Sequence, residues 1–309
     1  MRMGKQVWML LFAAMLQWGC GGAPQKAGQE ETLASGLIHI SVDESFKPVI
    51  DSQIRVFEAS FPNARIIAHY KPEAECLKDL RYDSIRMVIV TRGLTEGEVE
   101  LFRDTLGYAP RFGKMANDAI AVVVHQKSKD SLFDLRDIKG MLGGTVPSDK
   151  KLVMDGLQAT STVRFMLDSV LRGDKMGGRV QAAPTSEEVI DYVAKNPDAI
   201  GFVGVSWIGN KEDSTQLSFL TKVRISALNC RNCPDEVYVK PYQANIVMRR
   251  YPMVRGLHYI LKENYAGLGS GFVNFLTGER GQLIFKRAYL APSKMALQVR
   301  RMDMEESSF

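Results

Sequence analysis

The chain has 309 residues, of which 45% are hydrophobic and 24% are charged. This composition is typical of a globular protein of one or two domains and excludes a wholly disordered or low-complexity chain. The formal net charge is +5, and removal of residues 1–19, which hold two basic and no acidic residues, would leave +3. So small a charge argues against nucleic acid as a partner.

The N-terminus has the features of an export signal. Two basic residues precede an apolar run from Val7 to Leu16, which is too short to span a bilayer. A glycine followed by Cys20 resembles the bacterial lipoprotein signal, in which the cysteine is lipidated. We therefore predict a signal peptide at 1–19, a lipid on Cys20 and a flexible tether over 20–35. A plain signal peptide without a lipid is the alternative.

Strands and helices are predicted to alternate from residue 36 onward. Strands are indicated by alternating or continuous apolar residues, and helices by apolar residues at a spacing of three and four. This alternation predicts an α/β protein with a mostly parallel sheet covered by helices. The predicted strands are 36–43, 64–70, 86–91, 118–126 and 199–208, and the predicted helices are 44–62, 72–83, 95–107, 132–142, 163–173 and 186–197.

The C-terminal third is less regular. Residues 236–248 are predicted to be extended, and residues 251–265 and 270–290 to form two closing helices. No repeat and no long linker divides the chain. Two α/β lobes, with a chain that crosses between them more than once, fit this organisation.

Small polar residues stand at three expected strand-to-helix corners. They are Ser45, the pair Thr91 and Arg92, and the cluster from Ala159 to Thr162, which is followed by Arg164. The carboxyl ends of strands and the N–H groups of helix N-termini form ligand sites in α/β proteins, and neutral donors there suit a small oxyanion. Ser45 could equally be an ordinary helix N-cap.

Other chemistry finds little support in the sequence. Cys230 and Cys233 are spaced for a local disulfide in an exported chain, although free thiols or a redox role are alternatives, and Cys76 is expected to be a buried thiol. No metal site is predicted, because no second cysteine pair or paired histidines accompany them. The four histidines show no triad-like spacing, and nucleophile and phosphate-loop motifs are absent. We therefore expect neither an enzyme nor a cofactor.

Taken together, these segments resemble the periplasmic phosphate-binding proteins (PstS-type) of phosphate ABC importers, which have the type II periplasmic binding protein fold. No single segment is specific, but their order and spacing are similar to the family over nearly all of the chain beyond the tether. The segments are DESFKPVIDSQIRVFEASFP, VTRGLTEGE, NDAIAVVVH, DAIGFVGVSWI, YPMVRGLHYIL and FVNFLTGERGQLIF.

The resemblance implies a particular ligand site. Ser45 and Phe46 match the family's first ligand loop, and Thr91 and Arg92 the second, where Thr91 stands near a family aspartate that accepts a proton from phosphate. Counting back from Phe165 aligns Ala159, Thr160 and Ser161 with a family Ser-Gly-Thr. The family's arginine falls on Asp155, so Arg164 or Arg92 would have to supply the charge. The full expected set is Ser45, Phe46, Thr91, Arg92, Ala159, Thr160, Ser161, Thr162 and Arg164.

The resemblance also implies the function and the division into lobes. The first lobe would comprise 36–118 and 240–309 and the second 119–239, with the ligand cleft between them and crossings near 117–122 and 238–245. The expected protein captures inorganic phosphate or a similar oxyanion on the periplasmic side of the envelope and delivers it to an ABC permease. A degenerate homologue acting as an envelope sensor or accessory protein is the first alternative, and a phosphoester hydrolase the second.

Overall fold

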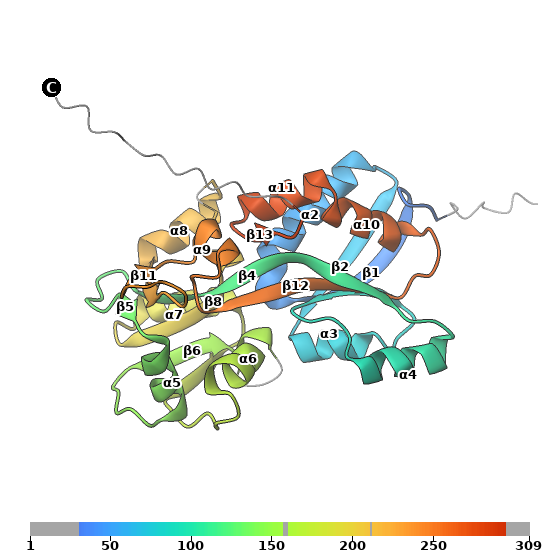
Figure 1. The fold of residues 1–309 in the computed structure, drawn as a ribbon. Helices are drawn as coiled ribbons and strands as arrows, with labels where there is room; N and C mark the ends of the chain where they lie inside the picture. The colour runs from blue at the N-terminus through green and yellow to red at the C-terminus, as the bar shows by residue number, and fades with distance from the viewer. Residues whose placement is uncertain (1–30, 157–159, 211, 295–309) are drawn as a thin grey trace, which may run out of the picture. The chain divides into compact units, whose positions relative to one another are not determined.

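The computed structural model describes residues 31–156, 160–210 and 212–294 (Figure 1). The predicted signal peptide, the lipidation site Cys20, most of the tether and the candidate ligand residue Ala159 lie outside these described residues. Within them, no helix is both long enough and apolar enough to cross a bilayer.

One half of the main sheet is built from the first three strands, which run parallel. Its strands are β1 (Gly36–Asp43), β2 (Ala64–Lys71) and β3 (Ile85–Val90), with β1 in the middle. The connecting helices are α2 (Lys47–Ser60), α3 (Glu73–Asp79) and α4 (Glu96–Leu106). Helix α2 packs with the C-terminal helices α10 (Leu268–Thr277) and α11 (Glu279–Arg287), while α3 packs against the opposite side of β1 and β3 (Figure 1).

The apolar spacing of α2 explains how it is held. Pro48 stands at the start of the helix, where its missing N–H costs nothing. Val49, Ile50 and Phe57 are buried on one face. The Phe57 ring meets that of Phe272 from α10 edge to face, with centroids 5.1 Å apart. Packing against the C-terminal helix α10 therefore holds α2 in place.

The other half of the sheet is also parallel, in the order β8-β6-β7. Its strands are β6 (Lys151–Asp155), β7 (Val180–Ala183) and β8 (Ala199–Gly204). Its helices are α5 (Leu135–Gly143), α6 (Ser161–Phe165), which continues as the π-helical turn η2 (Met166–Leu171), and α7 (Ser186–Lys195).

Strand β4 (Arg111–His125) belongs to both halves, because its two ends pair with different strands. Its first part, up to Ala119, pairs antiparallel with β12 (Val254–Leu261), and its second part, from Ile120 to Val124, pairs with β8. The strand is buried from Asp118 to Val124. A continuous apolar run of this kind is typical of a strand covered on both faces.

The remaining elements are short. A small separate sheet has the order β11-β10-β5. The elements are the 3-10 turns η1 (Glu44–Phe46) and η3 (Val205–Trp207), helices α8 (Ser214–Lys222) and α9 (Gln243–Val247), and strands β5 (Leu132–Phe133), β9 (Val223–Ile225), β10 (Ala227–Asn229), β11 (Tyr238–Val239) and β13 (Ala291–Pro292).

The helix predicted over 251–265 is wrong, since this segment forms strand β12 between β3 and β4. Met253, Leu257 and Ile260 are buried and spaced as on a helix. The register of β12 against β4 shifts between Leu257 and His258, and this irregularity breaks the two-residue alternation that would have identified a strand.

The structure differs in detail from two further predictions near the C-terminus. The segment 236–248 is only partly extended, because β11 is followed by helix α9. The closing segment 270–290 divides at Gly278 into α10 and α11. The chain returns to β4 through β12 rather than through the predicted crossing at 238–245.

Candidate functional site

Two of the predicted strand-to-helix corners meet in the structure. Ser45 follows β1 in the turn η1, and Ser161 begins α6 after β6. Their hydroxyl oxygens lie 3.4 Å apart although 116 residues separate them, and both side chains are buried. The Ser45 hydroxyl also donates to Asp155 Oδ2 at 3.0 Å. The fold therefore places the first and third predicted ligand segments side by side.

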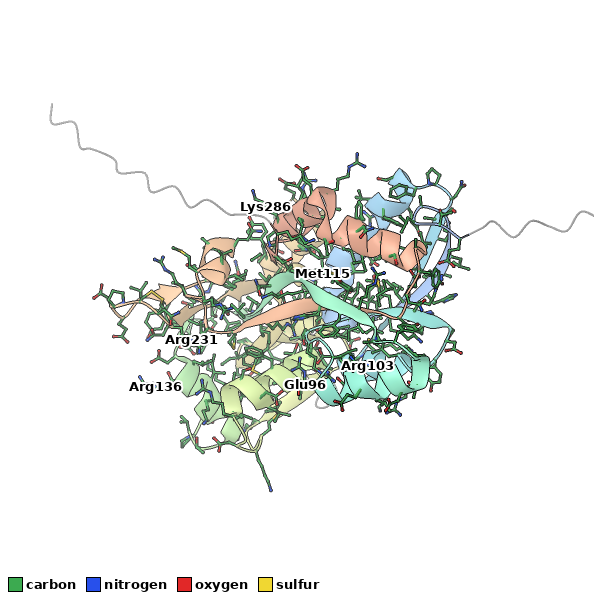
Figure 2. All side chains as sticks on the ribbon, turned by 45° about the vertical axis from the view of Figure 1, so that its right-hand side comes forward. Glu96, Arg103, Met115, Arg136, Arg231 and Lys286 are labelled. Atoms are coloured by element: carbon green, nitrogen blue, oxygen red, sulfur yellow. A yellow bond between two sulfur atoms is a disulfide. The ribbon has the colours of Figure 1, made fainter. Side chains whose placement is uncertain are left out.

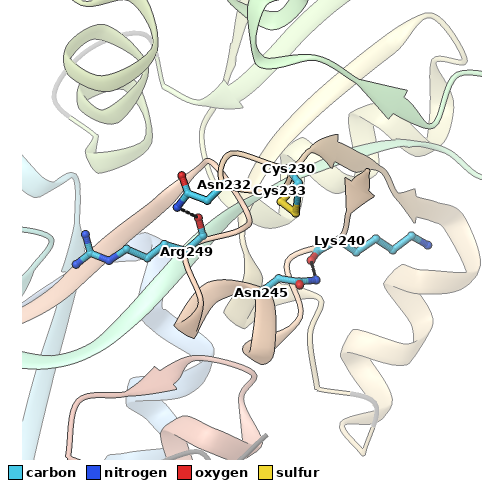
Figure 3. Close-up of a disulfide and its surroundings, with 6 residues drawn as sticks. All are labelled: Cys230, Asn232, Cys233, Lys240, Asn245 and Arg249. Carbon is cyan, nitrogen blue, oxygen red and sulfur yellow. Dashed lines mark hydrogen bonds between the residues drawn. A yellow bond between two sulfur atoms is a disulfide. The ribbon is translucent and has the colours of Figure 1, made fainter. Parts of the chain in front are cut away.

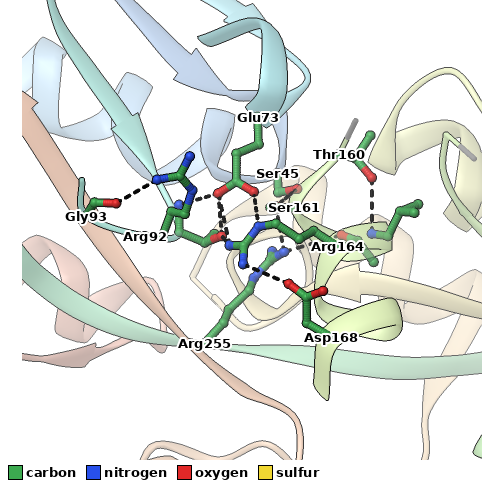
Figure 4. A network of polar contacts seen from close by, with 12 residues as sticks. Ser45, Glu73, Arg92, Gly93, Thr160, Ser161, Arg164, Asp168 and Arg255 are labelled. Carbon is green, nitrogen blue, oxygen red and sulfur yellow. Dashed lines mark hydrogen bonds and ion pairs between the residues drawn. The ribbon is translucent and has the colours of Figure 1, made fainter. Parts of the chain in front are cut away.

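Arg255 of β12 reaches the same point and is the cation of this cluster (Figure 4). Its Nη1 donates to Ser161 Oγ at 2.8 Å and to Thr162 Oγ1 at 3.3 Å. Its Nε donates to Asp118 Oδ2 at 2.9 Å. The guanidinium carbon lies 4.9 Å from the centre of the Phe46 ring, which is within the range of a cation–π contact. Only 6% of Arg255 is exposed.

Three buried carboxyl groups surround this guanidinium: Asp43, Asp118 and Asp155. Each has one oxygen without a hydrogen-bond partner, and Arg255 Nη2 has none either. Burial raises the pKa of all three carboxyls, against the opposing effect of Arg255, and that of Asp43 reaches about 7. The central cluster, defined as Asp43, Ser45, Asp118, Asp155, Ser161, Thr162 and Arg255, thus holds more acid than base.

Glu44 adds another carboxyl at the edge of this cluster. It accepts a hydrogen bond from the Ser186 hydroxyl at 2.9 Å and longer ones from the backbone N–H of the same residue. Burial, reinforced by the charge of Asp155, raises the pKa of Glu44 to about 7. The Glu44 carboxyl therefore changes between its protonated and ionised forms near neutral pH.

A second network joins Thr91 and Arg164 through Glu73 (Figure 4). Arg164 Nε donates to Glu73 Oε2 at 2.6 Å, and the Thr91 N–H donates to Oε1 at 2.8 Å. Burial acts to raise the pKa of Glu73, but the hydrogen bonds from Arg164 and Thr91 outweigh it and the pKa lies below the ordinary value. Glu73, which the sequence did not single out, thus compensates the charge of Arg164.

The other predicted residues are engaged locally. Arg92 forms a two-pronged ion pair with Glu98 at 2.7 and 2.8 Å, so the structure does not bring it into the central cluster. Thr160 caps α6, its hydroxyl accepting from the Val163 N–H at 3.2 Å. Phe46 contributes its ring to Arg255 as described above.

Arg255 and its acidic partners were missed for two reasons. Arg255 lies in the segment 251–265, which the apolar spacing predicts to be a helix and not the strand that pairs with β4. Asp118 falls within a predicted apolar strand, and only pairing of β4 with β12 brings it to Arg255. A charged residue within a continuous apolar strand was the one available signal, since such groups are rarely buried without a partner.

Metal ligation is not indicated among the residues that the structure describes, since they contain no group of three or more histidine, cysteine or acidic side chains able to hold an ion. The cluster instead offers hydroxyl donors and one guanidinium at a junction of two corners. Those groups can donate hydrogen bonds to an oxyanion. An ionised carboxylate can only accept a hydrogen bond from a protonated oxyanion, whereas a protonated carboxyl can donate one to it.

Residues 27–280 match the family PBP_like_2, which is described as a PBP superfamily domain. The chain belongs to this superfamily. No curated protein matches it. Solved structures with the same fold include a protein described as a phosphate ABC transporter substrate-binding protein with bound phosphate from Clostridium perfringens. It has a TM-score of 0.68 and 18% identity, and the match covers 84% of this chain and 100% of that one.

Further matches show how widely this superfamily's fold is used. An ABC-type phosphate transport receptor from Vibrio cholerae has a TM-score of 0.59 and 15% identity, covering 82% of this chain and 99% of its own. An OxyR2 regulatory domain from Vibrio vulnificus has a TM-score of 0.52 and 9% identity, covering 79% and 95%. The fold is therefore the two-lobed type II periplasmic binding protein fold predicted from the sequence, and the ligand has to be argued from the site.

Proposed function

We propose that the protein binds inorganic phosphate, or a similar small oxyanion, and passes it to an ABC import permease. The observation that carries the proposal is the convergence of the Ser45, Ser161 and Thr162 hydroxyls with the buried Arg255 guanidinium. Neutral donors at a helix start together with one arginine suit a tetrahedral anion. The solved neighbours described as phosphate transport proteins support the same ligand.

In this proposal Arg255 supplies the positive charge. The position of the family's arginine is taken by Asp155, which lies beside Ser45 in the cluster. Arg164 and Arg92, the cations expected from the sequence, are paired with Glu73 and Glu98. Arg255 lies on β12, whereas Asp155 lies on β6, but the Arg255 guanidinium donates to the Ser161 and Thr162 hydroxyls. Strand β12 therefore supplies the positive charge that the family's arginine would provide from the position of Asp155.

The proposed binding is coupled to protons. Asp43 and Glu44, with pKa values raised to about 7, are ionised above neutral pH and repel an anion. Below it they are neutral, and a protonated carboxyl can donate a hydrogen bond to an oxyanion. Affinity for phosphate is therefore expected to fall as the pH rises through about 7.

The proposal includes the division and the location of the chain. The lobes are 36–118 with 240–309, and 119–239, and β4 and β12 would form the hinge on which they close. Membership of a family of periplasmic binding proteins implies export. We add that Cys20 carries a lipid that holds the protein on the periplasmic side of the envelope, with residues 20–35 as its tether. No chemical reaction is part of the proposal.

Calorimetric titration with phosphate tests the proposal, using wild type, Ser161→Ala and Arg164→Ala. Ser161→Ala is expected to lower the affinity about tenfold, the usual effect of losing a hydrogen bond to a charged ligand. Arg164→Ala is expected to have a smaller effect, because Arg164 is held by Glu73. Ser218→Ala, at an exposed position of helix α8, is the matched control.

Parallel titrations with sulfate, molybdate and a phosphonate define the ligand. Absence of phosphate binding by wild type at concentrations up to about 1 mM would reject the transport function. Binding that is weakened by Arg164→Ala and not by Ser161→Ala would move the site away from the central cluster.

A second function is favoured by one observation in particular. The three carboxyls around Arg255 already neutralise it without any ligand. A homologue that has lost its oxyanion and serves as an envelope sensor or accessory protein would have such a self-compensated site. The titrations separate the two functions, because only the second leaves all four anions unbound in wild type.

A further inference from the structure

Two adjoining cavities form a groove at the junction of α5, η2, α9 and the start of β12. The larger, of about 570 Å³, and the smaller, of about 300 Å³, share Arg231, Pro252 and Val254 in their walls. Arg136 and Arg172 line the larger cavity, and Lys114 and Arg249 the smaller. We call these five basic residues, Lys114, Arg136, Arg172, Arg231 and Arg249, the arginine groove.

The arginine groove carries a strong uncompensated charge. All five basic side chains are exposed, whereas the walls of the two cavities hold a single acidic residue, Asp134. Arg136 lies 3.9 Å from Asp134. For the other four, no ion pair is formed with any residue that the structure describes. Arginines left unpaired beside one another repel, and an anionic partner would relieve this.

The backbone conformation at two of these arginines is a second, independent observation. Arg172 and Arg249 have φ values of 55° and 52°, in the left-handed region that favours glycine. Among described non-glycine residues only Tyr289 shares this feature. A side chain with a Cβ is unfavourable there, so each position carries an arginine at a cost to stability. Both positions stand at a helix end, η2 and α9, where the left-handed conformation is common but glycine is the usual residue, so an arginine at both is notable.

The disulfide loop fixes the middle of the groove. Cys230 and Cys233 are bonded on either side of Arg231, which lies on the same side of the molecule as Arg136 (Figure 2). The Arg231 N–H donates to the Arg250 carbonyl at 2.9 Å, and Asn232 Nδ2 donates to the Arg249 carbonyl at 3.3 Å (Figure 3). These bonds tie the Arg231 loop to the segment that carries Arg249.

The uncharged part of the walls distinguishes between kinds of anion. Beside polar residues such as Ser169, Asn229 and Asn117 it includes seven apolar side chains, which a free phosphate or a polyphosphate would not use. A flat membrane surface would reach exposed cations but not the walls of a recessed groove. The apolar lining consists of Leu135, Phe165, Val170, Ile246, Val247, Pro252 and Val254.

We propose that the arginine groove binds an acidic segment of a partner protein in which carboxylate side chains alternate with apolar ones. The carboxylates pair with Arg172, Arg231 and Arg249, whose guanidinium groups can each hold a carboxylate through two hydrogen bonds. The apolar side chains cover the lining. Arg255 of the central cluster also lines the smaller cavity, so the groove adjoins that cluster, although none of the five basic residues of the groove belongs to it.

Fluorescence anisotropy of a labelled peptide with the full chain in non-ionic detergent tests the proposal. The probe has about twelve residues, with glutamate alternating with leucine or valine, long enough to extend through both cavities. Wild type is expected to bind it, more weakly as salt is raised from about 50 to about 500 mM. A lysine-for-glutamate version of the probe is expected not to bind.

The variant of choice is Arg172→Gly with Arg249→Gly, because glycine is the favoured residue at both φ values. Its thermal midpoint is expected to equal or exceed that of wild type, while its affinity for the probe falls at least about tenfold. The matched control is Arg103→Gln with Arg280→Gln, which removes as many exposed charges elsewhere and is expected to bind as wild type does.

Three results would overturn the proposal. The first is no binding of the glutamate probe by wild type. The second is an equal loss of affinity in the control variant, which would show only general attraction to a basic protein. The third is binding to vesicles of phosphatidylglycerol that is stronger than binding to the peptide and is lost in the glycine variant, which would assign the groove to a membrane surface.

Discussion

Replacement of Arg255 by methionine is the sharpest test of the central cluster. The change keeps an apolar stem of similar length but removes the buried cation that faces Asp43, Asp118 and Asp155. Removing one partner of a buried ion pair destabilises a protein by about 3–5 kcal/mol, because the remaining charge is left uncompensated. Since each kcal/mol corresponds to roughly 2–4 °C in a chain of this size, the expected loss is about 6–20 °C in thermal midpoint.

The loss is expected to depend on pH. Arg255 lowers the pKa of all three carboxyls, so its removal raises their pKa values further above the ordinary 3.8. A carboxyl whose pKa is raised in the folded state stabilises the fold below its unfolded pKa, and this stability is lost as the pH rises through the folded value. The difference between wild type and variant is therefore small near pH 4, and the part due to Asp43 grows as the pH rises above about 7, the wild-type pKa, towards the still higher pKa of the variant.

Thermal unfolding followed by circular dichroism at about pH 5 and about pH 8 measures both effects. Arg280→Met, at an exposed position on α11, is the matched control and is expected to change little. Adding Asp118→Asn to Arg255→Met should recover part of the loss, because it removes the carboxylate that Arg255 Nε contacts. A loss below about 1 kcal/mol at high pH, or an equal loss at both pH values, would refute the reasoning.

Three other changes test separate parts of the structure. Asp43→Asn is expected to gain stability relative to wild type as the pH rises from about 4 to about 7, because the Asp43 carboxyl has a raised folded pKa; equal urea midpoints across this range would contradict it. Thr95→Ala should cost about 1 kcal/mol in urea unfolding by removing the cap of α4, whereas Thr95→Ser should cost little. Gly271→Ala should lower the thermal midpoint, since the new Cβ would lie 1.8 Å from the Leu33 carbonyl oxygen. Gly97→Ala should raise it, because nothing lies within 4 Å of the new Cβ and alanine favours a helix. A gain in thermal midpoint for both variants would contradict the predicted clash at Gly271.

Much of the fold followed from local pattern. The strands and helices up to β4, and again α7 and β8, follow from apolar spacing, whereas the short strands β6 and β7 were not predicted. The cap of α4 by Thr95 follows from a short motif. The error at β12 arose because the register shift between Leu257 and His258 gives a strand the apolar spacing of a helix. Local pattern could not correct this, since the pairing partners of β12 are more than one hundred residues away in the chain.

By itself the sequence determined the fold class and pointed to two corners that meet in the central cluster, because hydroxyl residues at strand-to-helix corners mark the carboxyl edge of a parallel sheet. Only the tertiary structure decided which charges stand there. Pairing of β12 with β4 brings Arg255 to Asp118 and Ser161, and packing of α3 brings Glu73 to Arg164. Burial then raises the carboxyl pKa values. Electrostatic energies depend on distance and burial in three dimensions, and neither quantity is present in residue spacing.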